Sequence, residues 1–238
     1  MNRSKRNSTD SQPPRIALLE DDLLLRDRIL VPKLERYGFE TDPFGTAAEL
    51  YAHLPQWNYD IVVLDIGLPD EDGFSVTRRL RTREPGLGIV MLTGRGETPD
   101  HIRGLTEGAD AYLTKPVDIE VLAATLHSLA RRLQSSATEP AASNTWRLDT
   151  NGWCLLSPNG QLIALTKTER RLVARLMEAP GQVVPREALI AALTSNVYDF
   201  DPHRIDSLVH RLRRKVGERC GESLPLVAVH GEGYVMGG

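Results

Sequence analysis

The 238-residue sequence predicts an α/β domain followed by a smaller α+β domain. From residue 15 to residue 133, short apolar runs alternate with helical patterns, which is typical of a doubly wound five-stranded parallel sheet. From residue 146 to residue 238, short strand-like runs flank three helical patterns, which is typical of a winged helix. Between these parts, residues 134–145 are small, polar and aperiodic, so a linker is expected there.

The elements of the first part follow from its apolar runs. Strands are expected near residues 15–19, 40–44, 61–64, 88–92 and 111–113, and helices near 22–37, 46–53, 74–83, 98–107 and 118–133. The run from Ile61 to Leu64 is apolar throughout, which fits a strand buried on both faces of a parallel sheet. Pro32 falls inside the first helix and removes a backbone donor, so a kink or break is expected near residues 28–32.

The second part begins with short antiparallel strands, expected between Trp146 and Leu165, with a turn at residues 157–160. Thr166 and Glu169 have the spacing of a capping box at the start of a helix. Two further helices are expected over 186–193 and 203–218, followed by strands at 226–229 and 234–236 around a tight turn.

Composition sets limits on the class of protein. Apolar residues make up 41% of the sequence and charged residues 26%, as in soluble globular proteins, and no apolar stretch approaches the roughly 20 residues that span a bilayer. Residues 1–14 are polar and basic, so a disordered tail is expected rather than a secretory signal. Cys154 and Cys220 lack metal-ligand spacing and are expected to be free thiols in a reducing cytosol. A cytoplasmic protein without membrane contact is therefore expected.

Polar side chains follow four of the predicted strands. Glu20 and Asp21 follow the first, Asp65 the third, Thr93 the fourth and Lys115 the fifth. Because the carboxyl ends of parallel strands share one edge of a sheet, these side chains should converge, although each alone could be an ordinary turn or surface residue. Carboxylates can hold Mg²⁺, the metal and the lysine can neutralise a phosphoryl group, and one aspartate can act as nucleophile.

The last predicted helix has one apolar and one basic face. The apolar residues recur at helical spacing, at Ile205, Leu208, Val209, Leu212 and Val216. The opposite and flanking surface carries Arg204, Ser207, His210, Arg211, Arg213, Arg214 and Lys215. Such a face is what a reader of the DNA major groove requires, because arginine can bind guanine and lysine can neutralise phosphate. A solvated charged face is the alternative.

These pieces together resemble a known family. Residues 15–133 resemble a response-regulator receiver domain, through Glu20-Asp21, the turn from Asp65 to Gly73, Leu92-Thr93, Gly108-Ala109-Asp110 and the stretch from Tyr112 to Pro116. Residues 146–238 resemble the OmpR/PhoB-type effector domain, through Leu165-Thr166-x-x-Glu169, Gly181-x-Val-Val, Arg186-Glu187-x-Leu189 and Gly231-x-Gly233-Tyr234.

The resemblance implies roles for the residues of the phosphoryl site. Asp65 would accept a phosphoryl group from a sensor histidine kinase, with Mg²⁺ held by Glu20, Asp21, Asp65 and the backbone carbonyl of Gly67. Thr93 would bond a phosphoryl oxygen, and Lys115 would pair with the phosphoryl group or with Asp65. Tyr112 would be the switch residue that moves with Thr93. A cis peptide bond is expected between Lys115 and Pro116.

The resemblance also implies partners, namely promoter double-stranded DNA, a second copy of the chain and RNA polymerase. The turn between the last two strands would enter the minor groove, and His230 stands there in place of the usual arginine. On the expected dimer face, Ala111, Val121 and Thr125 replace charged residues. A drier contact that includes Leu122 and Leu126 is therefore expected to hold the dimer together.

Two alternatives belong to other classes. A phosphatase of the haloacid dehalogenase type needs a second aspartate two residues after its nucleophile, and Gly67 occupies that position. A DNA-binding regulator that works without phosphorylation would not need the intact acidic pair, Thr93 and Lys115. The sequence therefore predicts a phosphorylation-regulated transcription factor rather than an enzyme.

Overall fold

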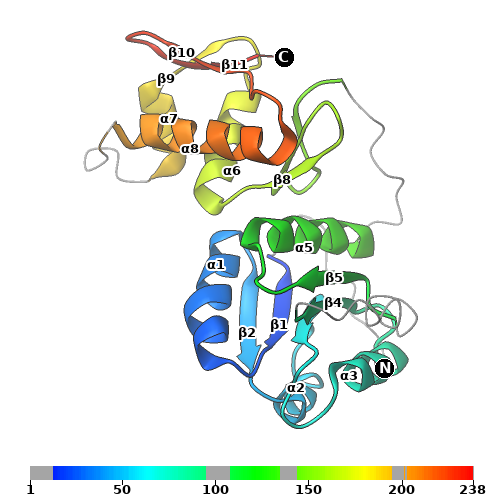
Figure 1. Cartoon of the computed structure of the whole chain (residues 1–238). Coiled ribbons are helices and arrows are strands. Elements are labelled where there is room, and N and C mark those ends of the chain that lie inside the picture. Colours follow the sequence, from blue (N-terminus) through cyan, green and yellow to red (C-terminus); the bar gives the residue numbers. More distant parts are fainter. Residues whose placement is uncertain (1–12, 95–107, 135–143, 195–200, 202, 238) are drawn as a thin grey trace. The chain divides into compact units, whose positions relative to one another are not determined.

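The structure, a computed structural model, divides into two compact units, Met1–Ser136 and Ala137–Gly238 (Figure 1). It describes residues 13–94, 108–134, 144–194, 201 and 203–237. The predicted helix at 98–107 and residues 1–12 of the predicted tail lie outside the described residues. The division falls within the segment 134–145, where the composition predicts a linker.

The first unit is built on a parallel sheet of five strands in the order β2-β1-β3-β4-β5. The strands are β1 (Arg15–Leu19), β2 (Glu40–Phe44), β3 (Ile61–Asp65), β4 (Gly88–Thr93) and β5 (Ala111–Thr114). Every residue of β3 and β4 is buried, as expected for strands covered on both faces. The chain places β2 on one side of β1 and β3 on the other. This arrangement puts the carboxyl ends of β1 and β3 at the switch point where open α/β sheets bind ligands. The predicted α/β fold is therefore confirmed.

Helices cover both faces of this sheet. They are α1 (Val31–Arg36), α2 (Ala47–His53), α3 (Gly73–Arg83) and α5 (Ile119–Gln134). Helices α1 and α5 lie on one face, whereas α2 and α3 lie on the other (Figure 1). Ala17 and Leu19 of β1 pack in one buried cluster with residues of α2 and α3, because side chains two apart on a strand point to the same face.

The first predicted helix consists of two helical segments of different type that meet next to Pro32. A π-helix, η1 (Leu24–Leu30), runs directly into α1, and the N–H group of Val31 donates to the carbonyl of Arg26. Pro32 lies in the first turn of α1, where a missing backbone N–H costs least. Leu30 and Leu34 remain buried on either side of the junction. The irregularity predicted near residues 28–32 is therefore present, but as a change from π to α hydrogen bonding at Val31 and not as a break, because the backbone stays helical there.

Helix α5 corrects one expectation about the dimer face. Leu122 and Leu126 are fully buried in the first unit, so they cannot form the expected dry contact with a second copy. The exposed large apolar residues of α5 are Val121 and Leu133, at 39% each. The helical stripe explains the error, because Leu122 and Leu126 are four residues apart and lie together on the face that packs on the sheet.

In its described residues, the second unit combines two small antiparallel sheets with three helices (Figure 1). Its strands are β6 (Arg147–Leu148), β7 (Cys154–Leu156), β8 (Leu162–Ala164), β9 (Val183–Pro185), β10 (Leu226–Val229) and β11 (Gly233–Met236). Its helices are α6 (Lys167–Met177), α7 (Arg186–Leu193) and α8 (His203–Cys220). This arrangement is that of the predicted winged helix. Cys154 and Cys220 are free thiols.

Two details fix the second unit. The predicted capping box is present, since Thr166 accepts from the N–H of Glu169 and Glu169 accepts from the N–H of Thr166. Strand β9 was not predicted, and it pairs with β11 where Gly233 lies opposite Pro185. A Cβ atom at Gly233 would lie 2.0 Å from the carbonyl oxygen of Val184, so only glycine allows the two strands to approach this closely.

None of the helices in the described ranges is long and apolar enough to span a membrane.

Candidate functional site

Three acidic residues meet at the carboxyl edge of the parallel sheet. Oxygen atoms of Glu20, Asp21 and Asp65 all lie within 4.8 Å of one another. Glu20 and Asp65 are buried, whereas Asp21 is exposed. The ends of β1 and β3 are neighbours in the sheet, and this pairing alone brings together residues that are 45 positions apart in sequence. The group offers only oxygen donors, which is the ligand chemistry of a hard divalent cation.

Lys115 links two of these carboxylates. Its Nζ atom lies 2.7 Å from Oδ2 of Asp65 and 2.8 Å from Oε2 of Glu20. Burial raises the pKa of Glu20 above its ordinary value, and the hydrogen bond from Lys115 opposes that shift. Burial alone would lower the pKa of Lys115, but its bonds with Asp65 and Glu20 raise it above its ordinary value. The lysine therefore stays charged and partly compensates the buried carboxylates.

Thr93 lies beside this pair at the end of β4. Thr93 is only 1% exposed, and its carbonyl oxygen accepts a hydrogen bond of 2.7 Å from the N–H group of Lys115. The peptide bond between Lys115 and Pro116 is cis, as expected. Thr93 and Asp65 thus end β4 and β3, Lys115 directly follows β5, and these three adjacent strands bring the residues to one edge of the sheet.

The turn after Asp65 is held by close backbone packing. A Cβ atom at Gly73 would lie 2.7 Å from Cα of Ile66 and 2.8 Å from the carbonyl oxygen of Asp65, so this position accepts only glycine. Gly67 lies next to the acidic group, because a Cβ atom there would be 3.9 Å from Oδ2 of Asp65. Gly67, whose backbone carbonyl is predicted to help hold the metal, therefore lies close to the acidic group.

Asp70 in this turn has a role that the sequence did not reveal. Its two carboxylate oxygens accept from the N–H groups of Ala47 and Ala48 at 3.1 and 3.0 Å, so it caps helix α2. Burial would raise the pKa of Asp70, but these backbone N–H groups lower it below its ordinary value. Asp70 therefore holds the turn after Asp65 against α2. Its position after Pro69, in the stretch that resembles the receiver family, is the sequence signal for this role.

Tyr112 and Asp110 are placed by β5 and the residues before it. Tyr112 is partly buried against the cluster that α2 and α3 form with the sheet. Asp110 is bonded inside its own unit, because it accepts from Arg81 and from the N–H of Ile89 at 2.8 and 2.9 Å. Arg132 also lies 2.9 Å from Asp110, so both carboxylate oxygens have partners within the chain.

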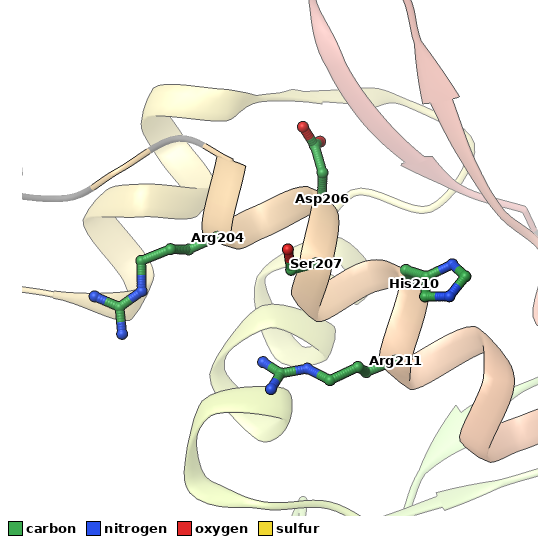
Figure 2. A pocket seen from close by; sticks show the side chains of 5 residues that line it. All are labelled: Arg204, Asp206, Ser207, His210 and Arg211. Carbon is green, nitrogen blue, oxygen red and sulfur yellow. The ribbon is translucent and has the colours of Figure 1, made fainter.

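The second candidate site is the outer face of α8. A hollow in the surface is lined by Arg204, Asp206, Ser207, His210 and Arg211 (Figure 2). The predicted set Arg204, Ser207, His210 and Arg211 is therefore brought together on one side of the helix. His230 lies in the turn between β10 and β11 and is exposed.

Two cations of the predicted DNA-binding face have other partners. The prediction for Lys215 is wrong, because its side chain is 8% exposed and its Nζ atom lies 2.9 Å from Oε2 of Glu169 inside the unit. Position 215 is seven residues after Leu208, which places it beside the buried stripe, and this spacing was the missed signal. Arg213 donates from Nε and from a terminal guanidinium nitrogen to the carbonyl of Leu226 in β10. Arg214 remains outward, with its side chain 64% exposed.

Asp206, Arg186 and Tyr234 form a cluster that sequence reasoning missed. Arg186 at the start of α7 donates to Oδ1 of Asp206 at 2.8 Å, and the hydroxyl of Tyr234 donates to the same oxygen. These bonds, that of Tyr234 first and that of Arg186 second, hold the pKa of Asp206 below its ordinary value. Arg186 and Tyr234 both lie in stretches that resemble the effector family, but nothing in the sequence pairs them with Asp206.

A phosphoacceptor-like acidic edge on a doubly wound sheet, together with a winged helix, defines the class of two-domain response regulators. Comparison with known families agrees with this class. Residues 16–127 match the response regulator receiver domain, and residues 160–236 match the family described as transcriptional regulatory protein, C terminal.

The curated relatives match nearly the whole chain. The two-component response regulator PhoP of Pseudomonas aeruginosa is 35% identical over 222 residues, which cover 93% of this chain and 97% of that protein. The transcriptional regulatory protein PhoP of Escherichia coli K12 is 33% identical, with coverage of 93% and 98%. Among solved structures, DrrB of Thermotoga maritima, an OmpR/PhoB homologue, matches with 25% identity and a TM-score of 0.47, covering 95% of this chain and all of that one. The chain belongs to the response regulators of the OmpR/PhoB type.

Proposed function

We propose that this chain is a transcription factor that is switched by phosphorylation of Asp65 and binds promoter DNA through α8. One observation carries the proposal. Asp65, Glu20 and Lys115 form a contiguous bonded group at the switch point of the sheet, with Thr93 on the adjacent strand end. Such a group has a nucleophile, charge compensation and a hydroxyl donor within one small volume. The receiver would span residues 15–133, and the effector domain residues 146–238 after the linker 134–145.

The transfer itself needs a phosphorylated histidine of a sensor kinase. A carboxylate oxygen of Asp65 attacks the phosphorus atom, an O–P bond forms, and the N–P bond breaks with its electron pair left on the imidazole nitrogen. Lys115 places a positive charge 2.7 Å from Oδ2 of Asp65, where the oxygens of the phosphoryl group gain negative charge. The hydroxyl of Thr93 is the candidate donor to one of these oxygens, and Tyr112 is the candidate switch that follows Thr93.

The acidic group fits Mg²⁺. Its carboxylate oxygens lie within 4.8 Å of one another, and small divalent cations are commonly held by one or two carboxylates together with phosphate oxygens. Glu20, Asp21 and Asp65 would hold the ion, together with the backbone of Gly67 in the adjoining turn. When bound, Mg²⁺ supplies positive charge that offsets the repulsion between the carboxylates and the incoming phosphoryl group. This fit supports a Mg²⁺-dependent transfer.

The effector half supports double-stranded DNA as the target. Arg204 and Arg211 border the hollow on α8 and are suited to bidentate contacts with base edges, while Arg214 is suited to phosphate. Ser207 and His210 lie between them, and His230 lies at the tip of the β10–β11 hairpin. A homodimer would present two such helices to two half-sites. RNA polymerase is the expected further partner, and the cytoplasm the expected location.

Labelling with a small phosphodonor tests the receiver proposal. Incubation of the full chain with acetyl phosphate and Mg²⁺ should add one phosphoryl group per chain, measured by intact mass. Asp65→Asn should abolish the addition, because the amide is nearly isosteric but not nucleophilic. Asp72→Asn is the matched control, since this exposed aspartate lies in the same turn and makes no side-chain cap bond to α3. Labelling should also disappear when the metal is chelated.

The outcomes separate the classes. Labelling that survives Asp65→Asn would place the nucleophile elsewhere and contradict the proposal. Release of free phosphate from many donor molecules per chain would favour a phosphatase. Absence of labelling at saturating Mg²⁺, together with specific DNA binding, would favour a regulator that works without phosphorylation.

A further inference from the structure

Asp206 is an acidic group on a surface built to meet polyanions. It is the one acidic residue between Arg204 and Arg211, and its side chain is 44% exposed at the edge of the hollow. It points away from Arg204, Ser207 and Arg211 (Figure 2). A lone carboxylate here would repel phosphates, so its presence on this face needs a physical reason.

The contacts of Asp206 supply that reason. Its Oδ1 atom accepts from Arg186 at 2.8 Å and from the hydroxyl of Tyr234, and the Arg186 guanidinium lies 5.2 Å from the centre of the Tyr234 ring. The three residues belong to α8, to the start of α7 and to β11. Arg186 also donates its backbone N–H to the carbonyl of Glu232 at 3.3 Å. The Asp206 carboxylate thus connects the outer face of α8 to the β10–β11 hairpin through its hydrogen bonds.

A second set of hydrogen bonds connects α8 to the start of the hairpin. Arg213 of α8 donates through two guanidinium nitrogens to the carbonyl of Leu226, the first residue of β10. Between Leu226 and Tyr234, the residues that make these two contacts, Val227 is 55% exposed and His230 is also exposed. Strand β10 is therefore attached to α8 at its first residue, and β11 at its second residue, close to the turn that carries the candidate DNA contact.

We infer that Asp206 is a positioning residue that fixes the β10–β11 hairpin against α8, so that both elements meet one composite DNA site in register. This inference rests on the proposed DNA-binding function. In this role Asp206 acts through Arg186 and Tyr234, which share its Oδ1 atom, and not through a base contact of its own. Its contribution is to specificity, since a hairpin that moves freely can meet DNA of any sequence but cannot reinforce the contacts of α8.

Asp206→Asn provides a test in which two explanations predict opposite signs. Simple electrostatics predicts tighter binding to every duplex, because a negative charge is removed from the DNA-facing surface. A positioning role predicts weaker binding to a specific duplex only, by roughly tenfold for the loss of a charged hydrogen bond. The probes are a duplex selected by the wild-type protein from a random library and a scrambled duplex of equal length. Glu218→Gln is the control, since it removes the same charge from α8 at a side chain that is 70% exposed.

The footprint supplies the readout that general destabilisation would not change. With Asp206→Asn, hydroxyl-radical protection at the edges of the site should weaken, while central protection by α8 persists. Tyr234→Phe, which keeps the ring and loses the hydroxyl, should show the same pattern with a melting temperature close to that of the wild type. Glu218→Gln should keep the whole footprint.

Two results would overturn the inference. One is unchanged or tighter specific binding by both Asp206→Asn and Tyr234→Phe. The other is equal weakening on specific and scrambled duplexes with a uniformly fainter footprint. If instead the wild-type protein selects no sequence from the library, the proposed DNA-binding function itself fails, and this outcome is recognised before any variant is made.

Discussion

The ammonium of Lys115 lies 2.8 Å from Oε2 of Glu20, a carboxylate whose side chain is only 1% exposed. The same ammonium reaches Asp65, so a single cation compensates a buried acid and the proposed phosphoacceptor. A buried ion pair of this kind costs desolvation energy that only its own bonds offset. Removing one partner therefore exposes the full penalty of burying the other.

Lys115→Met should destabilise the first unit strongly. The expected loss is roughly 3–5 kcal/mol in the free energy of unfolding, because Glu20 is left buried without its cation. Hydrogen exchange of backbone amides in β1 and β3, followed without added metal, measures this loss in the full chain. The double variant Lys115→Met, Glu20→Gln should recover most of the stability. A double variant as unstable as the single one would show that Glu20 is not the source of the penalty.

Asp70 should make the stability of the first unit depend on acidic pH. Its pKa is lowered in the folded state by the N–H groups of α2, so its contribution is present above the ordinary value of 3.8 and is lost as pH falls through the folded pKa. Asp70→Ala should lower the free energy of unfolding by about 1 kcal/mol at neutral pH, as loss of a helix cap does. This difference in stability from the wild type should shrink as the pH falls through the folded pKa of Asp70.

Thr46→Ala is the matched control for this pH dependence. Thr46 caps the same helix through a hydroxyl that accepts from the N–H of Glu49, and this hydroxyl does not titrate in the acidic range. Its loss should cost a similar amount at every pH, measured by urea unfolding between neutral and acidic pH. A cost of Asp70→Ala that stays constant across the same range would contradict the capping role of the ionised carboxylate.

Lys215 and Arg214 should respond to substitution in opposite ways. Lys215→Ala leaves Glu169 buried without its cation, so the second unit should lose roughly 3–5 kcal/mol of stability. Arg214→Ala should leave stability unchanged but lower the salt dependence of DNA binding by about one unit of slope, as expected for one lost phosphate contact. Thermal unfolding and binding titrations over a range of salt concentrations measure both quantities. If the salt dependence of DNA binding fell only in the Lys215 variant, Lys215 and not Arg214 would be the phosphate contact.

Arg211 should determine sequence preference. Arg211→Ala should weaken binding to a selected duplex by roughly 1–3 kcal/mol and remove the preference at one base pair, if the guanidinium reads a base edge. Competition with duplexes carrying single base changes measures this preference. Arg204→Ala is the comparison on the other side of the hollow, and it should alter preference at a different position. Equal weakening on all duplexes would identify Arg211 as a phosphate contact.

The sequence predicted the parallel sheet and the acidic edge well, because both depend on local patterns. The apolar run from Ile61 to Leu64 identifies a buried strand, and parallel pairing then places Asp65 beside Glu20 without further information. The missing donor of Pro32 also predicts an irregularity in the first helix, although only the structure shows that it is a change from a π-helix to an α-helix.

The errors concern pairings between distant residues. The charge of Lys215 favours a DNA contact, but its position next to the buried stripe directs the side chain inward, and its partner Glu169 lies 46 residues away. Asp206 and Tyr234 are 28 residues apart, and no local pattern joins them. Strand β9 is three residues long, and one of them is proline, so only its pairing with β11 defines it.

The π turn at the start of the first helix gives that helix a tolerance in length. In an α-helix each residue rotates the chain by about 100°, so an added residue would turn the exposed Leu23 and Leu24 away from their present direction relative to the buried Leu34. A π turn encloses one residue more than an α turn and absorbs this rotation locally. If an α turn replaced the π turn, or the reverse, this helix would lose or gain one residue. The acidic edge before the helix and strand β2 after it would keep their places.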